Sequence, residues 1–126
     1  MTPVFRASSF MALGRASACL LLATVVAGCA AEAGMELDAE AAVRAQLRDL
    51  DSARFSSVQV VDFPSSDNVP AGKAVCGQVN AKNGFGGYVG DRRFYYLPDS
   101  RLGAVESEPD DRYFNRDHAL YCGAQG

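Results

Sequence analysis

A single apolar run near the amino terminus divides this chain into a leader and a mature part. The run extends from Ala16 to Ala31 without a charged residue, and Arg6 and Arg15 are the only charges before it. Its length of about 16 residues falls short of the roughly 20 that a membrane-spanning helix needs. Positive charge followed by a short apolar segment is instead typical of an export signal. We therefore predict that residues 1–28 are a removable leader.

The end of this run predicts where the leader is cut. Val26-Ala27-Gly28-Cys29 places two small residues directly before a cysteine, a pattern that fits a narrow peptidase cleft and supplies a thiol for acylation. We expect cleavage before Cys29 and attachment of membrane lipid (palmitate-type acyl chains) to this residue, and several such chains make an effectively permanent anchor. Ala31-Glu32-Ala33 leaves open an ordinary secretory cleavage after Ala33.

Cleavage before Cys29 leaves 98 residues, enough for one domain with a modest core and too few for two. We assign residues 29–37 to a lipidated amino terminus with a short tether, and residues 38–126 to a single domain. The residue after Cys29 is Ala30 rather than an aspartate, a pattern that resembles that of lipoproteins sent to the outer membrane. We therefore expect the domain at the periplasmic face of the outer membrane, close to the bilayer.

Charge excludes one class of partner. Without the two leader arginines, ten basic residues face fifteen acidic ones, a net charge near −5. Arg92-Arg93 is the only notable pair of basic residues, so nucleic acid is not an expected partner.

The remaining cysteines, Cys76 and Cys122, predict one disulfide in an oxidising compartment. Metal binding and thiol chemistry are the alternatives. Two distant thiols and a single histidine make a poor zinc set, and there is no C-x-x-C motif. We expect no metal and no cofactor.

Hydrophobic periodicity predicts an α+β domain, with a small antiparallel sheet of three to four strands packed by an N-terminal helix and a short C-terminal helix. In the first helix, Ala39, Val43, Leu47 and Leu50 form one apolar stripe after a capping Asp38. A small β-sandwich or open barrel is the alternative if the C-terminal segment is not helical. The predicted helices cover residues 38–50 and 110–122, and the predicted strands cover residues 57–63, 73–81, 88–97 and 102–107.

One segment is distinctive, because residues 76–90 read C-G-Q-V-N-A-K-N-G-F-G-G-Y-V-G. It resembles a family of small exported bacterial proteins, many of them lipoproteins, with a C-G-x-V-N-x-K-N-x-F-G-G-Y-x-G core, an upstream D-P-x-S-A-x-F segment and a downstream phenylalanine. Here the upstream segment begins at Asp49 with Leu50 in place of the proline, and the downstream residue is Phe94. The resemblance implies export and assigns no activity.

Two interpretations of this segment remain open. In the first it is a hairpin in which glycines permit positive φ, asparagines bond the backbone, and Phe85 and Tyr88 fold back over the sheet edge. In the second it is a recognition loop with an aromatic anchor and a polar rim. The candidate recognition residues are Asn80, Lys82, Asn83, Phe85 and Tyr88, with Arg92 beside them.

Catalytic motifs are absent from the sequence. There is no G-x-S-x-G, H-E-x-x-H or phosphate-binding glycine loop. We expect the single histidine, His118, to be packed on a helix. We expect the acidic run Glu106, Glu108, Asp110 and Asp111 to be a solvated loop that also places negative charge at a helix start. The sequence thus favours a non-catalytic, lipid-anchored envelope protein that docks a membrane-proximal protein or a cell-wall glycan. The alternative is an inhibitor or immunity-type lipoprotein directed at a cell-wall hydrolase.

Overall fold

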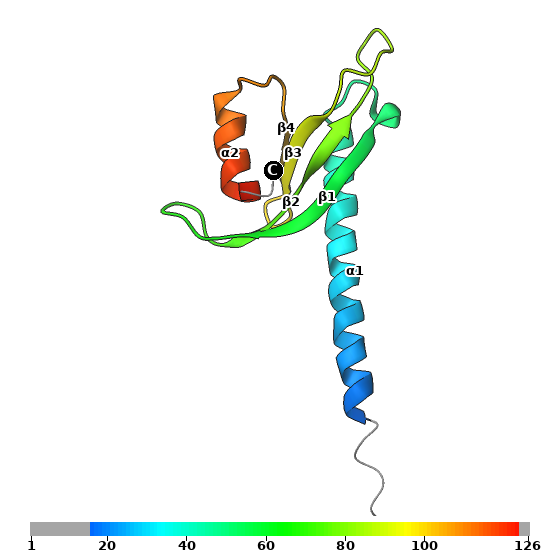
Figure 1. Cartoon of the computed structure of the whole chain (residues 1–126), viewed down its shortest axis with the longest axis vertical. Coiled ribbons are helices and arrows are strands. Elements are labelled where there is room, and N and C mark those ends of the chain that lie inside the picture. The colour runs from blue at the N-terminus through cyan, green and yellow to red at the C-terminus, as the bar shows by residue number, and fades with distance from the viewer. Residues whose placement is uncertain (1–15, 124–126) are drawn as a thin grey trace, which may run out of the picture. The chain divides into compact units, whose positions relative to one another are not determined.

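A computed structural model describes residues 16–123, with side chains from residue 27 onward. Arg6, Arg15 and the rest of the first fifteen leader residues lie outside the described part. The chain divides into two units at the Ala31–Glu32 bond, and the description below concerns the second unit. Among the described residues, no helix has the length and apolar character needed to cross a membrane. The elements in chain order are α1 (Ala16–Arg44), η1 (Leu50–Ser52), β1 (Arg54–Phe63), β2 (Gly72–Asn80), β3 (Arg92–Leu97), β4 (Leu102–Val105) and α2 (Arg112–Cys122) (Figure 1).

The predicted α+β class is confirmed. The four strands form an antiparallel meander in the order β1-β2-β3-β4, and the sheet carries helices rather than a second sheet, so the β-sandwich alternative is wrong. Alternation along β2 sends Cys76 toward α2 and Val75 toward α1, because successive side chains of a strand point to opposite faces. Each face of the sheet therefore has its own hydrophobic core.

The first core lies between the sheet and the last turns of α1. Ala39 and Val43 of α1 are fully buried there, together with Phe94 of β3. The second core lies under α2, where Phe114 packs against Tyr95 with ring centroids 5.7 Å apart. Two thin cores, one on each face, hold the short sheet between the helices.

The disulfide prediction is confirmed. Cys76 on β2 and Cys122 at the end of α2 are bonded, with their Cα atoms 6.0 Å apart. The bond closes a loop of 46 residues and ties the C-terminal helix to a central strand.

The N-terminal helix has other bounds than the sequence predicts. Residues 30–37, which we assigned to a short tether, are helical and belong to α1, because their alanine, glutamate, methionine and leucine residues are strong helix formers. The helix ends at Arg44 rather than near Leu50. Asp49 caps a separate 3₁₀ turn by accepting a hydrogen bond from the Ser52 amide, and Leu50 is 49 % exposed.

Strand boundaries also differ from the prediction. The third strand begins at Arg92 rather than at residue 88, because Lys82 and Tyr88 pair across a loop instead. The first strand begins at Arg54, earlier than expected, and contains a β-bulge between Ser56 and Gln59. β4 ends at residue 105, and α2 begins one residue after its cap, Asp111.

Candidate functional site

The loop joining β2 to β3, residues 81–91, is built around one asparagine side chain. Asn83 Oδ1 accepts hydrogen bonds from the backbone amides of Phe85 at 2.9 Å and Gly87 at 3.2 Å. The Asn83 amide donates in turn to the Gly87 carbonyl at 2.8 Å. These bonds close a small ring that includes Gly86 at a φ of 81°, a conformation that glycine adopts without strain.

A second asparagine closes the base of the loop. Asn80 Oδ1 accepts a hydrogen bond from the Gly90 amide at 3.1 Å, and Gly90 has a φ of 97°. The predicted backbone-bonding role is thus confirmed for both asparagines. Positive φ is found at Gly86 and Gly90 but not at Gly84 or Gly87.

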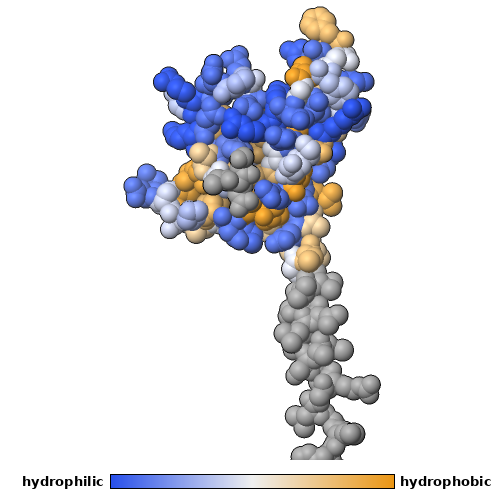
Figure 2. All heavy atoms as spheres, in the orientation of Figure 1, coloured by the Kyte–Doolittle hydropathy of each residue, from blue (hydrophilic) through white to orange (hydrophobic). Residues whose placement is uncertain are grey.

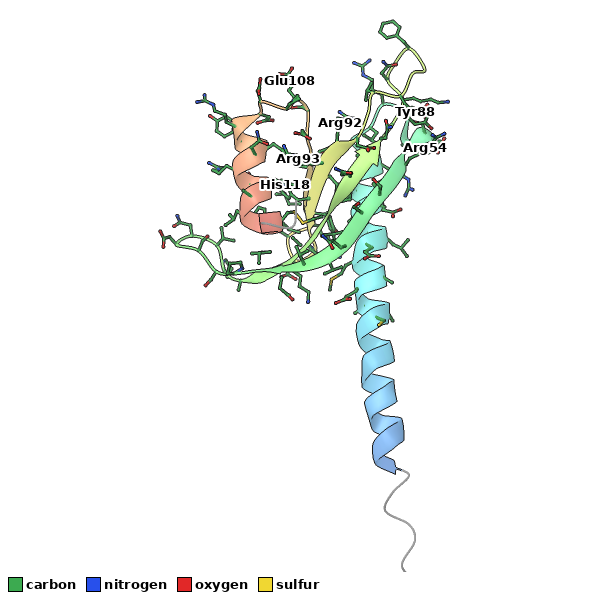
Figure 3. The ribbon with its side chains drawn as sticks, viewed as in Figure 1. Arg54, Tyr88, Arg92, Arg93, Glu108 and His118 are labelled. Atoms are coloured by element: carbon green, nitrogen blue, oxygen red, sulfur yellow. A yellow bond between two sulfur atoms is a disulfide. The ribbon has the colours of Figure 1, made fainter. Side chains whose placement is uncertain are left out.

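The two aromatic residues of the loop have different environments. Phe85 is 99 % exposed, so the expectation that it folds back over the sheet edge is wrong. Tyr88 is held at the base: its hydroxyl donates to the Ser52 carbonyl at 3.2 Å, and its ring lies 4.2 Å from the Arg54 guanidinium carbon (Figure 3). The loop therefore projects a bare phenyl ring from a support anchored to the start of β1.

Polar and charged groups surround that support. Figure 2 shows hydrophobic residues at the outer end of the loop and hydrophilic residues around its base. The ammonium of Lys82 lies 5.6 Å from the Tyr88 ring centroid. A hollow of about 320 Å³ beside the loop is lined by Lys82, Asn83 and Arg92 together with Arg48 from the segment after α1. The structure thus brings four of the predicted residues and Arg92 to one end of the domain, while Asn80 supports them from β2.

A second hollow, of about 200 Å³, lies under α2 beside the disulfide. Ser57, at the β-bulge with a φ of 52°, lines it together with His118 and Arg93. His118 is 6 % exposed. Its burial lowers its pKa, and the nearby Arg93 charge acts in the same direction while Glu106 opposes it. The expectation of a packed histidine is confirmed.

Arg93 is held by groups from two other elements. It forms an ion pair with Glu106, which also accepts from the Arg93 amide at 3.1 Å, and its guanidinium donates to Asn115 of α2. Hydrogen bonding from Arg93 lowers the pKa of Glu106. The expectation of a solvated acidic run is therefore wrong for Glu106, and Asp111 caps α2 through the amides of residues 113 and 114.

The second hollow contains a serine and a histidine in its lining. No hydrogen bond joins Ser57 to His118 in the part of the chain that the structure describes. Within residues 16–123, no three His, Cys, Asp or Glu side chains converge as metal ligands would.

Sequence reasoning missed three contributors to the loop site, namely Arg48, Ser52 and Arg54. They lie just before β1 or, for Arg54, at its first residue, more than 25 residues before the loop, and they reach the loop only because β1 and β2 are antiparallel neighbours. Cys29, the predicted lipidation site, is exposed and is not in a disulfide. Comparisons with family models, with curated proteins and with solved structures return no match to this chain.

Proposed function

We propose that this protein is a lipid-anchored, non-catalytic binding module of the cell envelope, and that its loop of residues 81–91 docks a protein partner. The observation that carries the proposal is the contrast at Phe85. The side chain is 99 % exposed, whereas its backbone is fixed by Asn83. A rigid aromatic ring loses little conformational entropy on binding, and such residues act as anchors in protein interfaces.

Lys73 and the loop of residues 81–91 mark the two ends of β2. Lys73, at the start of β2, has a raised pKa because of its hydrogen bond to Asp62 and the charge of Asp62, with a smaller contribution from the charge of Glu32. The charge of Glu32 thus acts at the beginning of β2, whereas the loop follows the end of this strand. Nine strand residues span about 30 Å at roughly 3.3 Å per residue.

Lipid on Cys29 would hold the domain near the bilayer. Only two residues lie between Cys29 and Glu32, and these three chain steps reach about 10 Å at most. A partner therefore either lies at the membrane or extends toward it from the periplasm or from the cell wall.

Two measurements test the proposal. The first is mass spectrometry of the amino-terminal peptide from envelopes, which is expected to show an acylated Cys29; an unmodified peptide starting after Ala33 would contradict lipid anchoring. The second is crosslinking capture in native envelopes with wild type and a Phe85→Ala, Tyr88→Ala variant. The matched control is Tyr113→Ala, which removes a 74 % exposed aromatic from α2.

We expect a partner that wild type and the Tyr113 control capture equally, and that the loop variant loses while its unfolding transition stays cooperative. Equal capture by the loop variant would place the interface elsewhere and refute the docking role of the loop.

The projecting tip also favours a second candidate, an inhibitor that inserts the loop into the cleft of a cell-wall hydrolase. The supporting observation is that Phe85 stands clear of the domain on a hydrogen-bonded turn. This candidate predicts that the purified chain slows peptidoglycan digestion by extracts of the same envelopes, and that the loop variant does not.

A further inference from the structure

Three basic side chains from separate segments line the hollow beside the loop. Arg48 follows α1, Lys82 begins the loop and Arg92 begins β3. The remaining polar lining comes from Gln46 and Asn83, and no carboxylate is part of the wall. This is a local concentration of positive charge on a chain whose formal net charge is −3.

These charges are not neutralised within the domain. The ion pairs of the described residues involve other cations, and Arg48, Lys82 and Arg92 belong to none of them. Asp91 adjoins Arg92 in the sequence but neither lines the hollow nor forms one of these pairs. The three cations therefore remain available to a ligand.

Arg92 provides an independent sign of a missing partner. Its Nε atom is buried and has no hydrogen-bond acceptor in the part of the chain that the structure describes. A buried guanidinium donor without an acceptor is costly, because water no longer solvates it. Arg92 also lines the hollow, so an oxygen ligand bound there would supply the acceptor once the guanidinium turns toward it.

Contacts with the loop hold the other two cations in place. The Arg48 Nη1 atom lies against Gly84, at 3.3 Å from where a Cβ on that glycine would stand. The Lys82 ammonium is positioned by the Tyr88 ring. The hollow therefore shares its wall with the support that carries Phe85.

We propose that this hollow is a carboxylate-binding site, occupied by an acidic side chain of the protein partner that Phe85 contacts. The assignment of the carboxylate to that partner rests on the proposed docking function. An arginine matches the planar geometry of a carboxylate, and the lysine adds a charge-assisted hydrogen bond. A bare anion would make no use of the adjacent phenyl ring, whereas a protein segment would use both features.

The first test needs no partner. The ¹⁵N-labelled full chain in detergent is titrated with sodium acetate, sodium phosphate and sodium chloride at constant ionic strength, and the Arg92 Nε–H and Gly84 amide resonances are followed by NMR. We expect saturable shifts with acetate and none with chloride. Lys82→Met should weaken acetate binding by about tenfold, while Arg112→Gln, an equal loss of charge on exposed α2, should bind as wild type does.

The second test uses capture from native envelopes. Lys82→Met, checked for wild-type thermal unfolding, should reduce capture of the partner, and added salt should reduce capture by wild type. The absence of a saturable acetate shift overturns the proposal, as does binding of phosphate alone.

A variant pattern separates this proposal from the docking function. Capture that is lost in Phe85→Ala, Tyr88→Ala but unchanged in Lys82→Met would refute the carboxylate contact and leave docking intact. Capture that is unchanged in both the loop variant and Lys82→Met would refute docking by the loop. If the hollow nevertheless binds acetate in the titration, the assignment of the carboxylate to the partner is overturned.

Discussion

The side-chain oxygen of Asn83 lies 2.9 Å from the backbone nitrogen of Phe85 and accepts its hydrogen bond, so the residue that shapes the loop also fixes its exposed tip. This local bond fixes the backbone from which the fully exposed aromatic ring projects. The loop has no core of its own, and its order comes from side-chain acceptors that replace the missing ladder bonds of a strand.

Two substitutions separate the residue that orders the loop, Asn83, from the residue exposed at its tip, Phe85. Phe85→Ala should leave the free energy of unfolding within about 0.5 kcal/mol of wild type, because the ring buries almost no surface. Asn83→Ala should instead speed hydrogen exchange at the amides of residues 85 and 87, which lose their acceptor. Slow exchange in Asn83→Ala would show that the loop is ordered by something else.

The disulfide should contribute a large part of the stability of this domain. Closing a loop of 46 residues is worth about 4 kcal/mol in the chain-entropy treatment. Urea unfolding of Cys76→Ser, Cys122→Ser should therefore show a loss of about that size, whereas Cys29→Ser should unfold as wild type does. Equal stability of the double variant and wild type would contradict the role of the disulfide.

Gly77 should be intolerant of even a methyl group. A Cβ at this position would stand 2.9 Å from Phe94 Cζ and 3.1 Å from the Val58 Cα, and the second of these is backbone. Gly77→Ala should cost about 1–3 kcal/mol through overpacking, as measured by thermal or urea unfolding. Gly84→Ala on the loop, which faces only the end of the Arg48 side chain, is the matched control and should be far milder.

His118 should make stability depend on pH near neutrality. Burial lowers its pKa in the folded state below the ordinary value of 6.5, so below about pH 6.5 the unfolded chain binds more protons than the folded one. Stability is therefore complete above pH 6.5 and declines as the pH falls toward the folded-state pKa. Urea unfolding at pH 7.5 and 5.5 measures this decline.

His118 is the single histidine of the chain, so the loss of stability between pH 7.5 and 5.5 can be assigned to it by one substitution. His118→Gln should flatten the change between pH 7.5 and 5.5. It should leave the loss at more acid pH, where protonation of Glu106, whose pKa is lowered by Arg93, removes its ion pair. An unchanged slope in His118→Gln would refute this account.

Local sequence patterns were sufficient to predict much of the fold. The alternation of Ala74, Val75 and Cys76 assigns β2 and its two faces, because strand side chains alternate regardless of context. The acidic residues before α2 predicted where this helix begins, and Asp111 caps it. The oxidised pair of cysteines followed from their number alone.

The bounds of the N-terminal helix were harder to predict, because they depend on competing local signals. Leu50 continues the helical stripe of α1 in sequence, yet α1 ends at Arg44 and Leu50 begins a separate 3₁₀ turn capped by Asp49. Residues 30–37 have a small and polar composition typical of linkers, but their intrinsic propensity is helical. In both places two short-range rules disagreed, and periodicity alone did not reveal which rule prevailed.

The sequence by itself determined the class of the domain, its disulfide, and the asparagines and glycines that shape the loop, because these depend on periodicity, cysteine count and turn chemistry within a few residues. Only the tertiary structure decided that Phe85 is bare while Tyr88 is held by Arg54, and that Arg48, Lys82 and Arg92 meet around one hollow. Tyr88 and Arg54 are 34 positions apart in the sequence, as are Lys82 and Arg48. The antiparallel pairing that brings them together is set by burial of the two cores, not by any local pattern.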